Sequence, residues 1–354
     1  MSNDKWARNA IQSIVRENHG TADTHLFKLP TNFTKADIYL KDESTHPTGN
    51  LKHRLAASLF LHALCNGRIH EDTTVFEESS GNTAISEAYF AQLIGVKFIA
   101  VVDKNISDEK KKLIKFYGGR LEVFDSSNAR KKAIRRLKNR GYYFMNQFKY
   151  AEQATDWRGN NNIAETIFSQ LQRESNPIPD YIVVGAGTGG TSATIGRYIR
   201  YKNFRTKLVV VDPYKSAFFG HWEMGVKQLD KNAEENLAEG IGRPRVEKSF
   251  LKEVIDDMKQ VSNREAIASM LWLHELTRKK AGPSTGSNIW GSIQIAMENE
   301  SKAGAKPITI VTLMCDGGEI YPDLYDPKAR SQKKGLEDLG YETRLLNTLS
   351  ATNR

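Results

Sequence analysis

The sequence predicts an α/β protein with two domains, each a mostly parallel sheet covered by helices. Short β-branched runs alternate along the chain with segments of helical periodicity, and this alternation is typical of parallel strands joined by crossover helices. The chain has 354 residues. A chain of this length usually forms more than one hydrophobic core, so we expect it to fold as two domains. We predict a smaller domain at 42–150 and a larger one formed by 1–41 with 151–354.

The β-branched runs are short, and several are followed by a segment with a helical period. The predicted strands are 38–43, 74–77, 97–102, 120–124, 181–185, 207–212 and 308–313. The predicted helices include 53–67, 83–95, 162–174 and 191–201. Gly67, Gly95 and Gly118 stand where such segments end, as expected for helices that stop at a left-handed residue. Ligands of parallel sheets bind at the carboxyl ends of the strands, so we expect the functional residues in the loops that follow them.

The composition is that of an ordinary globular chain, with 39% hydrophobic and 26% charged residues. There is no apolar run of about 18 residues, as a membrane span would need, and the beginning of the sequence lacks the apolar stretch of a secretion signal. The two cysteines, Cys65 and Cys315, lie in apolar surroundings and are expected to be buried, reduced thiols. These features favour a cytoplasmic protein without a membrane partner.

The net charge of +9 raises the possibility of a nucleic-acid partner, since basic residues gather at 110–115, 130–140 and 327–334. In the first two segments apolar residues interrupt the charges at helical spacing, as on the solvated face of an amphipathic helix. No nucleic-acid-binding motif accompanies these segments. We therefore expect no nucleic-acid partner, although a basic surface helps to collect small anions.

A glycine-rich loop follows the predicted strand at 181–185. The segment YIVVGAGTGGTSATIGRYIR (181–200) reads as a strand, a tight turn and a helix of small residues. Glycines allow backbone N–H groups to approach an anion closely, and a helix N-terminus adds positive partial charge. We predict a phosphate site here. Its residues are Gly187, Thr188, Gly189, Gly190 and Thr191.

The same segment also fits a dinucleotide-binding pattern, through Gly185, Gly187 and Gly190. A second strand then ends at Asp212, where such a site would place its ribose-binding acid. An NAD-binding Rossmann oxidoreductase is therefore an alternative. Against it, the pattern lies in the middle of the chain, Pro213 directly follows the acid, and two further motifs stay unexplained.

The first of these motifs contains Lys52, which follows a Pro-Thr-Gly-Asn turn at the start of an apolar helical segment. A lysine held there is partly desolvated, which frees its amine for Schiff-base formation. An ordinary surface lysine beside a turn fits the same pattern. The second motif is ESSGNT (78–83), where hydroxyls and backbone N–H groups at a helix N-terminus favour a carboxylate-binding site. Helix capping explains part of this motif, but it needs fewer polar residues.

Together these segments resemble the cysteine synthase and cystathionine β-synthase family, the fold-type II pyridoxal 5'-phosphate (PLP) enzymes, whose fold is like that of the tryptophan synthase β subunit. The resemblance runs in order along nearly the whole chain, through KDESTHPTGNLK (41–52), SSGNT (79–83), NQF (146–148), GTGGT (187–191), GIG (240–242) and GPSTG (282–286). It implies that Lys52 is catalytic and that no metal is needed. The implied cofactor-binding residues are Lys52, Asn82, Gly187, Thr188, Gly189, Gly190, Thr191 and Ser284. The implied substrate-binding residues are Ser79, Ser80, Gly81, Thr83, Gln147 and Gly240.

Two positions depart from the family pattern: His53 replaces an aspartate after the lysine, and Ala84 replaces a glycine after the carboxylate loop. Longer matches, such as ATDWRGNNNIAE (154–165), resemble a subgroup of L-cysteine desulfhydrases. One fold of this kind supports several chemistries. The roles of His53, Glu78, His221, Trp222 and Asp316 are left open by the sequence.

The resemblance implies β-elimination on L-cysteine, giving sulfide, pyruvate and ammonia. The alternative within the family is β-replacement of the cysteine synthase type, with O-acetylserine as substrate, and a non-catalytic PLP-binding partner protein is a third possibility. Ser284 would place a neutral hydroxyl at the pyridine nitrogen, which favours loss of a β-substituent over transamination. The family also implies a homodimer.

Overall fold

The computed structural model describes residues 2–19, 23–159, 161–226 and 236–350. The chain forms two compact units, a smaller one of Met1–Asp23 with His46–Asp156 and a larger one of Thr24–Thr45 with Trp157–Arg354. Residues 1–23 thus group with the smaller unit, whereas the sequence predicted them in the larger domain. The reason is that Ala10 and Ile14 are buried in the smaller unit's core.

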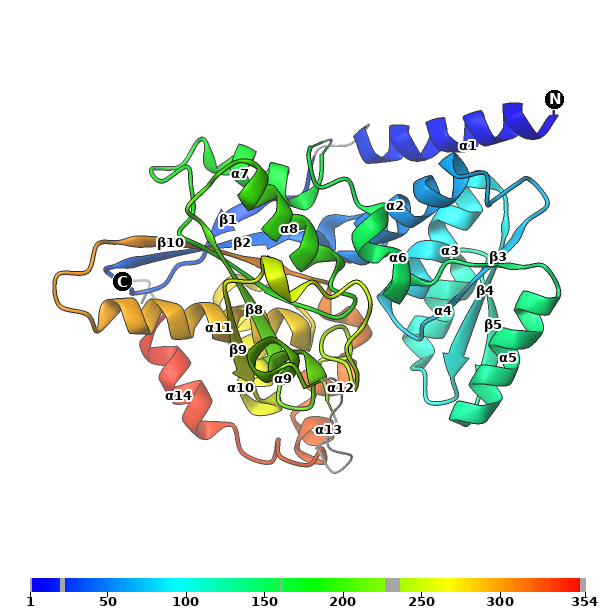
Figure 1. The fold of residues 1–354 in the computed structure, drawn as a ribbon. Helices are drawn as coiled ribbons and strands as arrows, with labels where there is room; N and C mark the ends of the chain where they lie inside the picture. Colours follow the sequence, from blue (N-terminus) through cyan, green and yellow to red (C-terminus); the bar gives the residue numbers. More distant parts are fainter. Residues whose placement is uncertain (1, 20–22, 160, 227–235, 351–354) are drawn as a thin grey trace. The chain divides into compact units, whose positions relative to one another are not determined.

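The smaller unit is built on a four-stranded parallel sheet with the order β5-β4-β3-β6. Its strands are β3 (Thr74–Glu78), β4 (Lys97–Asp103), β5 (Arg120–Phe124) and β6 (Tyr143–Phe144). Its helices are α1 (Ser2–His19), α2 (Lys52–Cys65), α3 (Asn82–Ile94), α4 (Asp108–Phe116), α5 (Ser127–Asn139) and α6 (Gln147–Ala154). Val75 joins a core shared with α2 and α3, and its neighbour Phe76 joins one shared with α5. Adjacent residues of a strand point to opposite faces, so helices cover both faces of this sheet (Figure 1).

The larger unit is built on a six-stranded sheet with the order β1-β2-β10-β7-β8-β9, in which only β1 is antiparallel among the described strands. Its strands are β1 (Leu26–Lys28), β2 (Ala36–Asp42), β7 (Tyr181–Gly185), β8 (Lys207–Pro213), β9 (Asp257–Val261) and β10 (Ile308–Met314). Its helices are α7 (Ile163–Leu171), α8 (Gly190–Tyr201), α9 (Ala217–Met224), α10 (Asn263–Thr277), α11 (Pro283–Glu300), α12 (Pro322–Tyr325), α13 (Pro327–Ser331) and α14 (Gly340–Thr348). Short 3-10 turns occur at Glu43–Thr45, Lys252–Val254 and Gly318–Ile320.

The central strands of the larger sheet are buried on both faces. Val209 and Val211 pack into a core with residues of α10 and α11. Val210 between them is equally buried, and α8 contacts both β7 and β8. This double burial explains why the sequence KLVVVD is an unbroken apolar run rather than an alternating one.

All seven predicted strands are present within one or two residues of their predicted ends, and the predicted α/β class is confirmed. Gly67, Gly95 and Gly118 all have positive φ angles, as predicted for the ends of helices. The sequence did not predict β1, β6 and β9. Two of these are very short, and the third, DMKQV, lies at the edge of its sheet and is only partly apolar.

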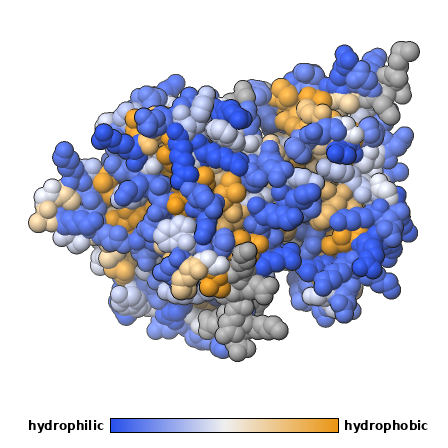
Figure 2. All heavy atoms as spheres, viewed as in Figure 1, coloured by the Kyte–Doolittle hydropathy of each residue, from blue (hydrophilic) through white to orange (hydrophobic). Residues whose placement is uncertain are grey.

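The surface is largely polar on the face seen in Figure 2, with smaller hydrophobic areas among the hydrophilic residues. On α5 the apolar residues Ala133 and Leu137 are buried while the basic residues around them are exposed, as the helical spacing predicted. Within the part of the chain that the structure describes, no helix is long and apolar enough to cross a membrane. The expectation of two buried thiols is wrong, because Cys65 is exposed at the end of α2 and Cys315 is only partly buried.

Candidate active site

Lys52 is the first residue of α2, directly after the turn that the sequence motif predicted. The side-chain oxygen of Asn50 accepts a hydrogen bond from the Lys52 backbone N–H at 2.9 Å. The same oxygen accepts one from the Ser86 hydroxyl on α3 at 3.1 Å. Asn50 therefore fixes the backbone of Lys52 and ties it to the helix that follows the SSGNT loop.

His53 extends this buried network. The Thr48 hydroxyl lies 3.2 Å from His53 Nδ1 and 3.0 Å from the Ser86 hydroxyl. The His53 ring stacks on His46, with centroids 4.9 Å apart, and is itself buried. The residue that departs from the family pattern beside Lys52 thus helps to hold the Lys52 turn against α3.

The SSGNT loop follows β3 and leads into α3, which begins at Asn82. Ser79 and Ser80 make local hydrogen bonds here. The Ser79 hydroxyl accepts from the Gly81 N–H at 3.2 Å, and the Ser80 hydroxyl accepts from the Asp103 N–H at 2.9 Å. The backbone N–H groups at the start of a helix have no partner within the helix, which makes this end suited to bind a carboxylate.

Gln147 lies after the carboxyl end of a strand that neighbours the strand before the SSGNT loop. It is the first residue of α6 and follows β6, which pairs with β3 in parallel. The Thr83 hydroxyl donates to Gln147 Oε1 at 2.7 Å. Because Thr83 binds its amide oxygen, the Gln147 side chain keeps its N–H donors for another group. The structure thus brings together Thr83 and Gln147, two of the predicted substrate-binding residues.

Two buried glutamates lie on the strand and the helix that flank this loop, and the sequence did not mark them as site residues. Glu77 on β3 and Glu87 on α3 both have 0% of their surface exposed. Burial raises the pKa of Glu77 to about 8, against the lowering effect of hydrogen bonds from backbone N–H groups. Burial and the nearby Glu77 charge raise the pKa of Glu87 well above its usual range. Neither oxygen of Glu87 has a hydrogen-bond partner among the described residues.

We expect replacement of Glu87 to stabilise the protein. Leucine would remove an unpartnered buried carboxyl, whose burial costs roughly 1–3 kcal/mol. A raised pKa in the folded state means that stability is greatest below the usual pKa of 4.5 and is lost as the pH rises towards the folded-state value. Glu87→Leu should therefore raise the melting temperature, and raise it more at pH 8 than at pH 5.

The isosteric variant Glu87→Gln separates the two effects in the same melting experiment. It should weaken the pH dependence while keeping an unpartnered polar group, so its gain at pH 5 should be small. A lower melting temperature for Glu87→Leu at both pH values would contradict this expectation, since it would mean that the Glu87 carboxyl stabilises the folded protein.

The predicted phosphate loop lies between β7 and α8 in the larger unit. Gly189 caps α8 with a φ of 88°, and the Gly190 N–H donates to the Thr188 hydroxyl at 3.2 Å. A Cβ at Gly187 would overlap the carbonyl oxygen of Gly240, and one at Gly189 would lie 2.6 Å from Phe250 Cα. These glycines are required by close backbone approach, and a helix N-terminus, whose first N–H groups have no acceptor within the helix, suits a phosphate.

The glycine turn at 240–242 and Ser284 lie beside this loop. The Gly242 N–H donates to the Ala186 carbonyl at 2.8 Å, which joins the turn to the segment after β7. The Ser284 hydroxyl lies 3.9 Å from the position that a Cβ of Gly240 would take. Ser284 is 5% exposed, and its hydroxyl makes no hydrogen bond to any residue that the structure describes. An unpartnered hydroxyl next to a phosphate-binding loop fits the ring nitrogen of PLP.

Glu78 and Asp316, two of the other residues that the sequence left open, have structural partners. Glu78 pairs with Arg130 at 2.7 Å. Asp316 accepts from the Gly282 N–H at 3.1 Å and from the Tyr321 hydroxyl at 2.8 Å, so it supports the segment that leads to Ser284. His221 and Trp222 both lie on α9.

Asp212, the acid of the dinucleotide alternative, is fully buried. One of its oxygens accepts from the Phe219 N–H at 2.9 Å, and burial raises its pKa to about 7. A fully buried carboxyl that binds the backbone of α9 is unsuited to bind a ribose. The geometry therefore disfavours the NAD-binding alternative.

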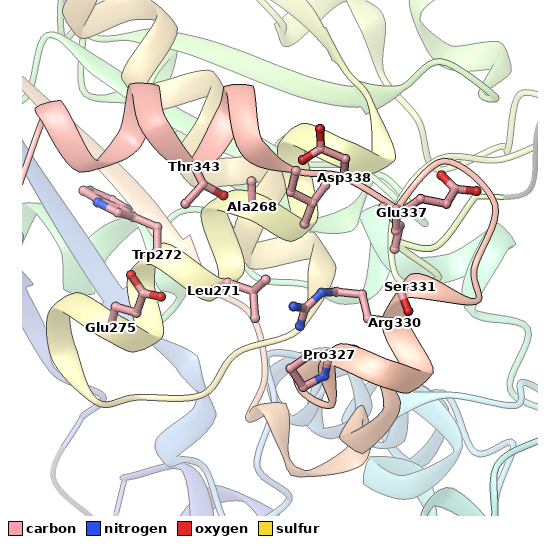
Figure 3. A pocket seen from close by; sticks show the side chains of 12 residues that line it. Ala268, Leu271, Trp272, Glu275, Pro327, Arg330, Ser331, Glu337, Asp338 and Thr343 are labelled. Atoms are coloured by element: carbon pink, nitrogen blue, oxygen red, sulfur yellow. The ribbon is translucent and has the colours of Figure 1, made fainter.

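A cavity of about 360 Å³ lies elsewhere in the larger unit, among α10, α13 and the start of α14 (Figure 3). Apolar residues such as Leu271 and Trp272 form part of its lining, together with Arg330 and exposed acids such as Glu337. None of the predicted site residues lines it. It is therefore not the site of the predicted chemistry.

Comparison with known proteins gives the family. The sequence profile described as "Pyridoxal-phosphate dependent enzyme" matches residues 18–316. "L-cysteine desulfhydrase Cds1" of Mycobacterium tuberculosis (strain ATCC 25177 / H37Ra) is 48% identical over 343 residues, which cover 95% of this chain and 92% of that protein. "Cysteine synthase B" of Campylobacter jejuni is 30% identical over 304 residues, covering 84% of this chain and 92% of that protein.

Solved structures show the same fold. O-ureido-L-serine synthase superposes with a TM-score of 0.74 at 25% identity, covering 88% of this chain and 92% of that one. A hydrogen sulfide-producing enzyme from Fusobacterium nucleatum superposes with a TM-score of 0.73 at 24% identity, covering 86% and 98%. The predicted fold-type II architecture and PLP cofactor are thereby confirmed. The chain belongs to the pyridoxal-phosphate dependent enzyme family.

Proposed function

We propose that this protein is an L-cysteine desulfhydrase, which converts L-cysteine and water to sulfide, pyruvate and ammonia. The observation that carries the proposal is the 48% identity to a desulfhydrase across 95% of the chain. The geometry of each unit supports it. In the smaller unit, Asn50 links the backbone of Lys52 to the helix that follows the SSGNT loop. In the larger unit, the phosphate loop lies against the Gly240 turn, which has Ser284 beside it.

Each of the predicted residues has a role in this proposal. Lys52 would hold the cofactor covalently and would take the proton from the Cα of the amino-acid substrate. The N–H groups of 187–191 hold the cofactor's phosphate, and Asn82 contacts its 3'-hydroxyl. The residues that bind the substrate carboxylate and the region around it are Ser79, Ser80, Gly81, Thr83, Gln147 and Gly240. PLP, when bound, supplies the electron sink that makes the Cα proton acidic.

Ser284 directs the reaction in this proposal. Its hydroxyl is neutral and has no partner among the described residues, so it accepts or donates a hydrogen bond at the ring nitrogen without holding a charge there. A weaker electron sink favours prompt loss of the β-substituent over transamination. We therefore expect purified protein to release sulfide with very little aminotransferase activity.

The second candidate is β-replacement of the cysteine synthase type. The 30% identity to a cysteine synthase over 84% of the chain supports it. The two reactions share every residue named above and differ in the fate of the substrate after the β-group leaves. In one case water completes the reaction, and in the other a second nucleophile adds.

Product analysis separates the two candidates. With L-cysteine alone, we expect sulfide and pyruvate in equal amounts, because one molecule of each leaves per turnover. With O-acetylserine and sulfide, we expect cysteine to form slowly by comparison. Rapid cysteine formation without pyruvate would reverse the ranking, and no turnover in either assay by PLP-loaded protein would favour a non-catalytic role.

We further propose that the protein works as a homodimer in the cytoplasm, without a nucleic-acid or membrane partner. The family resemblance supports the dimer. The exposed basic residues of α5 are distributed as on a solvated helix face, which supports the absence of a nucleic-acid partner. Light scattering of the purified protein at several concentrations should give a mass of about twice 39.9 kDa.

A further inference from the structure

Glu77 is a buried acid that the proposed chemistry does not use. It lies on β3, between the neighbouring strands β4 and β6, and none of its surface is exposed. A carboxyl group in such a place is costly unless its oxygens are bound. Those bonds show what Glu77 does.

The Glu77 carboxyl binds backbone N–H groups on two segments. One oxygen accepts from the Glu78 N–H at 2.7 Å, at the end of its own strand. The other accepts from the Gln147 N–H at 2.9 Å, at the start of α6. Asn146, which also contributes a backbone hydrogen bond, has a φ of 55°, a left-handed value that a residue with a side chain adopts at a cost. Glu77 thus holds a strained turn whose next residue is Gln147.

Gln147 is held at both ends. Glu77 binds its backbone, and the Thr83 hydroxyl binds its side-chain oxygen at 2.7 Å. Because its backbone N–H and its side-chain oxygen are both bound, the orientation of the Gln147 amide N–H donors is fixed. All three side chains are buried in the smaller unit.

We propose that Glu77 is a positioning residue for Gln147, and that it sets the affinity for the carboxylate of the amino-acid substrate. The inference rests on the proposed function in one respect, namely that Gln147 binds the substrate carboxylate. Glu77 itself touches neither substrate nor cofactor in this account. It acts by fixing the turn that carries Gln147.

The test compares Glu77→Gln and Glu77→Leu with the wild-type enzyme. Glu77→Leu removes both acceptors, and a misplaced hydrogen bond to a charged group is worth about tenfold to a hundredfold in binding. We expect KM for L-cysteine to rise by that factor, with a smaller change in kcat and an unchanged visible absorption band of the bound cofactor. Glu77→Gln keeps one acceptor oxygen and should recover part of the affinity.

Glu87 provides the matched control. It is a glutamate of the same burial in the same unit, but it makes no hydrogen bond to the described residues. Glu87→Gln should leave KM within about twofold of the wild type, since the Glu87 carboxyl makes no hydrogen bond to Gln147 or Thr83. An equal rise in KM for Glu87→Gln and Glu77→Gln would show a general effect of the buried acids and overturn the proposal.

A mutant cycle decides the matter even where Glu77→Leu does not fold. In a Gln147→Ala background, Glu77→Gln should change KM by less than about twofold, because no amide remains to be positioned. The same rise in KM in both backgrounds, or no rise in either, would contradict the proposal.

Failure of the proposed function gives a different result. In that case the wild-type protein releases no sulfide from L-cysteine. The positioning role is then measured by titrating PLP-loaded protein with L-cysteine and with L-serine and following the cofactor's absorbance. The amino-acid concentration at the midpoint of this titration should still be higher for Glu77→Gln than for the wild type.

Discussion

Replacing Lys52 with alanine is expected to abolish both turnover and the visible absorption of the bound cofactor. The variant lacks the amine that holds PLP covalently and takes the Cα proton, and loss of a general base alone costs roughly 10²–10⁴-fold in rate. The fold should survive, because the variant keeps the backbone N–H of residue 52, which Asn50 binds. Sulfide release and an absorption spectrum of each preparation provide the measurement.

Lys97 offers a matched control for this experiment. It is an exposed lysine of the same unit, at the amino end of β4, whereas the SSGNT loop follows the carboxyl end of β3. Lys97→Ala should keep the colour and the activity of the wild type. If Lys52→Ala kept the absorption band, another lysine would hold the cofactor and the assignment would be wrong.

The second large effect is expected for Gly187→Ala. The added Cβ would overlap the carbonyl oxygen of Gly240, so the phosphate loop and the Gly240 turn would have to move apart. Overpacking of this kind costs about 1–3 kcal/mol, which corresponds to a loss of roughly tenfold to a hundredfold in PLP affinity if the strain is released at the cofactor site. Titration of the cofactor-free variant with PLP, followed by absorbance, measures the change.

Gly220→Ala is the control for an added methyl group. Gly220 lies within α9, and a Cβ there would meet Val226 at 3.8 Å, an ordinary van der Waals distance. This variant should bind PLP as the wild type does and should melt at the same temperature or slightly higher, since alanine favours a helix. A Gly187→Ala variant with wild-type PLP affinity would show that the loop does not hold the phosphate.

The strands of this fold were predictable because most of them are buried on both faces. An unbroken run of β-branched residues between turn residues, as in KLVVVD, predicts a buried strand. The edge strand β9 was missed because only two residues of DMKQV, Met258 and Val261, are buried and the segment includes two charged side chains. Whether a strand lies at the edge of a sheet depends on the order of all the strands, so it cannot be predicted from the sequence of that strand alone.

The assignment of α1 could not be made from the sequence for a similar reason. Its pattern shows an apolar face with Ala10 and Ile14, and so predicts that the helix packs against something. It does not say what. The partner is the core formed by α2 and α3, whose residues come more than thirty positions later in the sequence.

The candidate site divides in the same way. Lys52, the SSGNT loop and the glycine loop were found because each combines several unusual residues within a short motif. Glu77 and Ser86 were not, because their roles depend on Gln147 and Asn50, which are 70 and 36 positions away. An acid next to the apolar residues of a buried strand, as in TVFEE, was the available signal for Glu77.

The central claim is that PLP is joined to the amine of Lys52, and chemical reduction tests it most directly. Borohydride treatment of the purified, PLP-loaded protein makes the bond permanent, and digestion followed by mass spectrometry locates it. We predict that the cofactor's mass is found on the peptide containing Lys52. Its presence on another lysine, or its absence from all of them, would contradict the account.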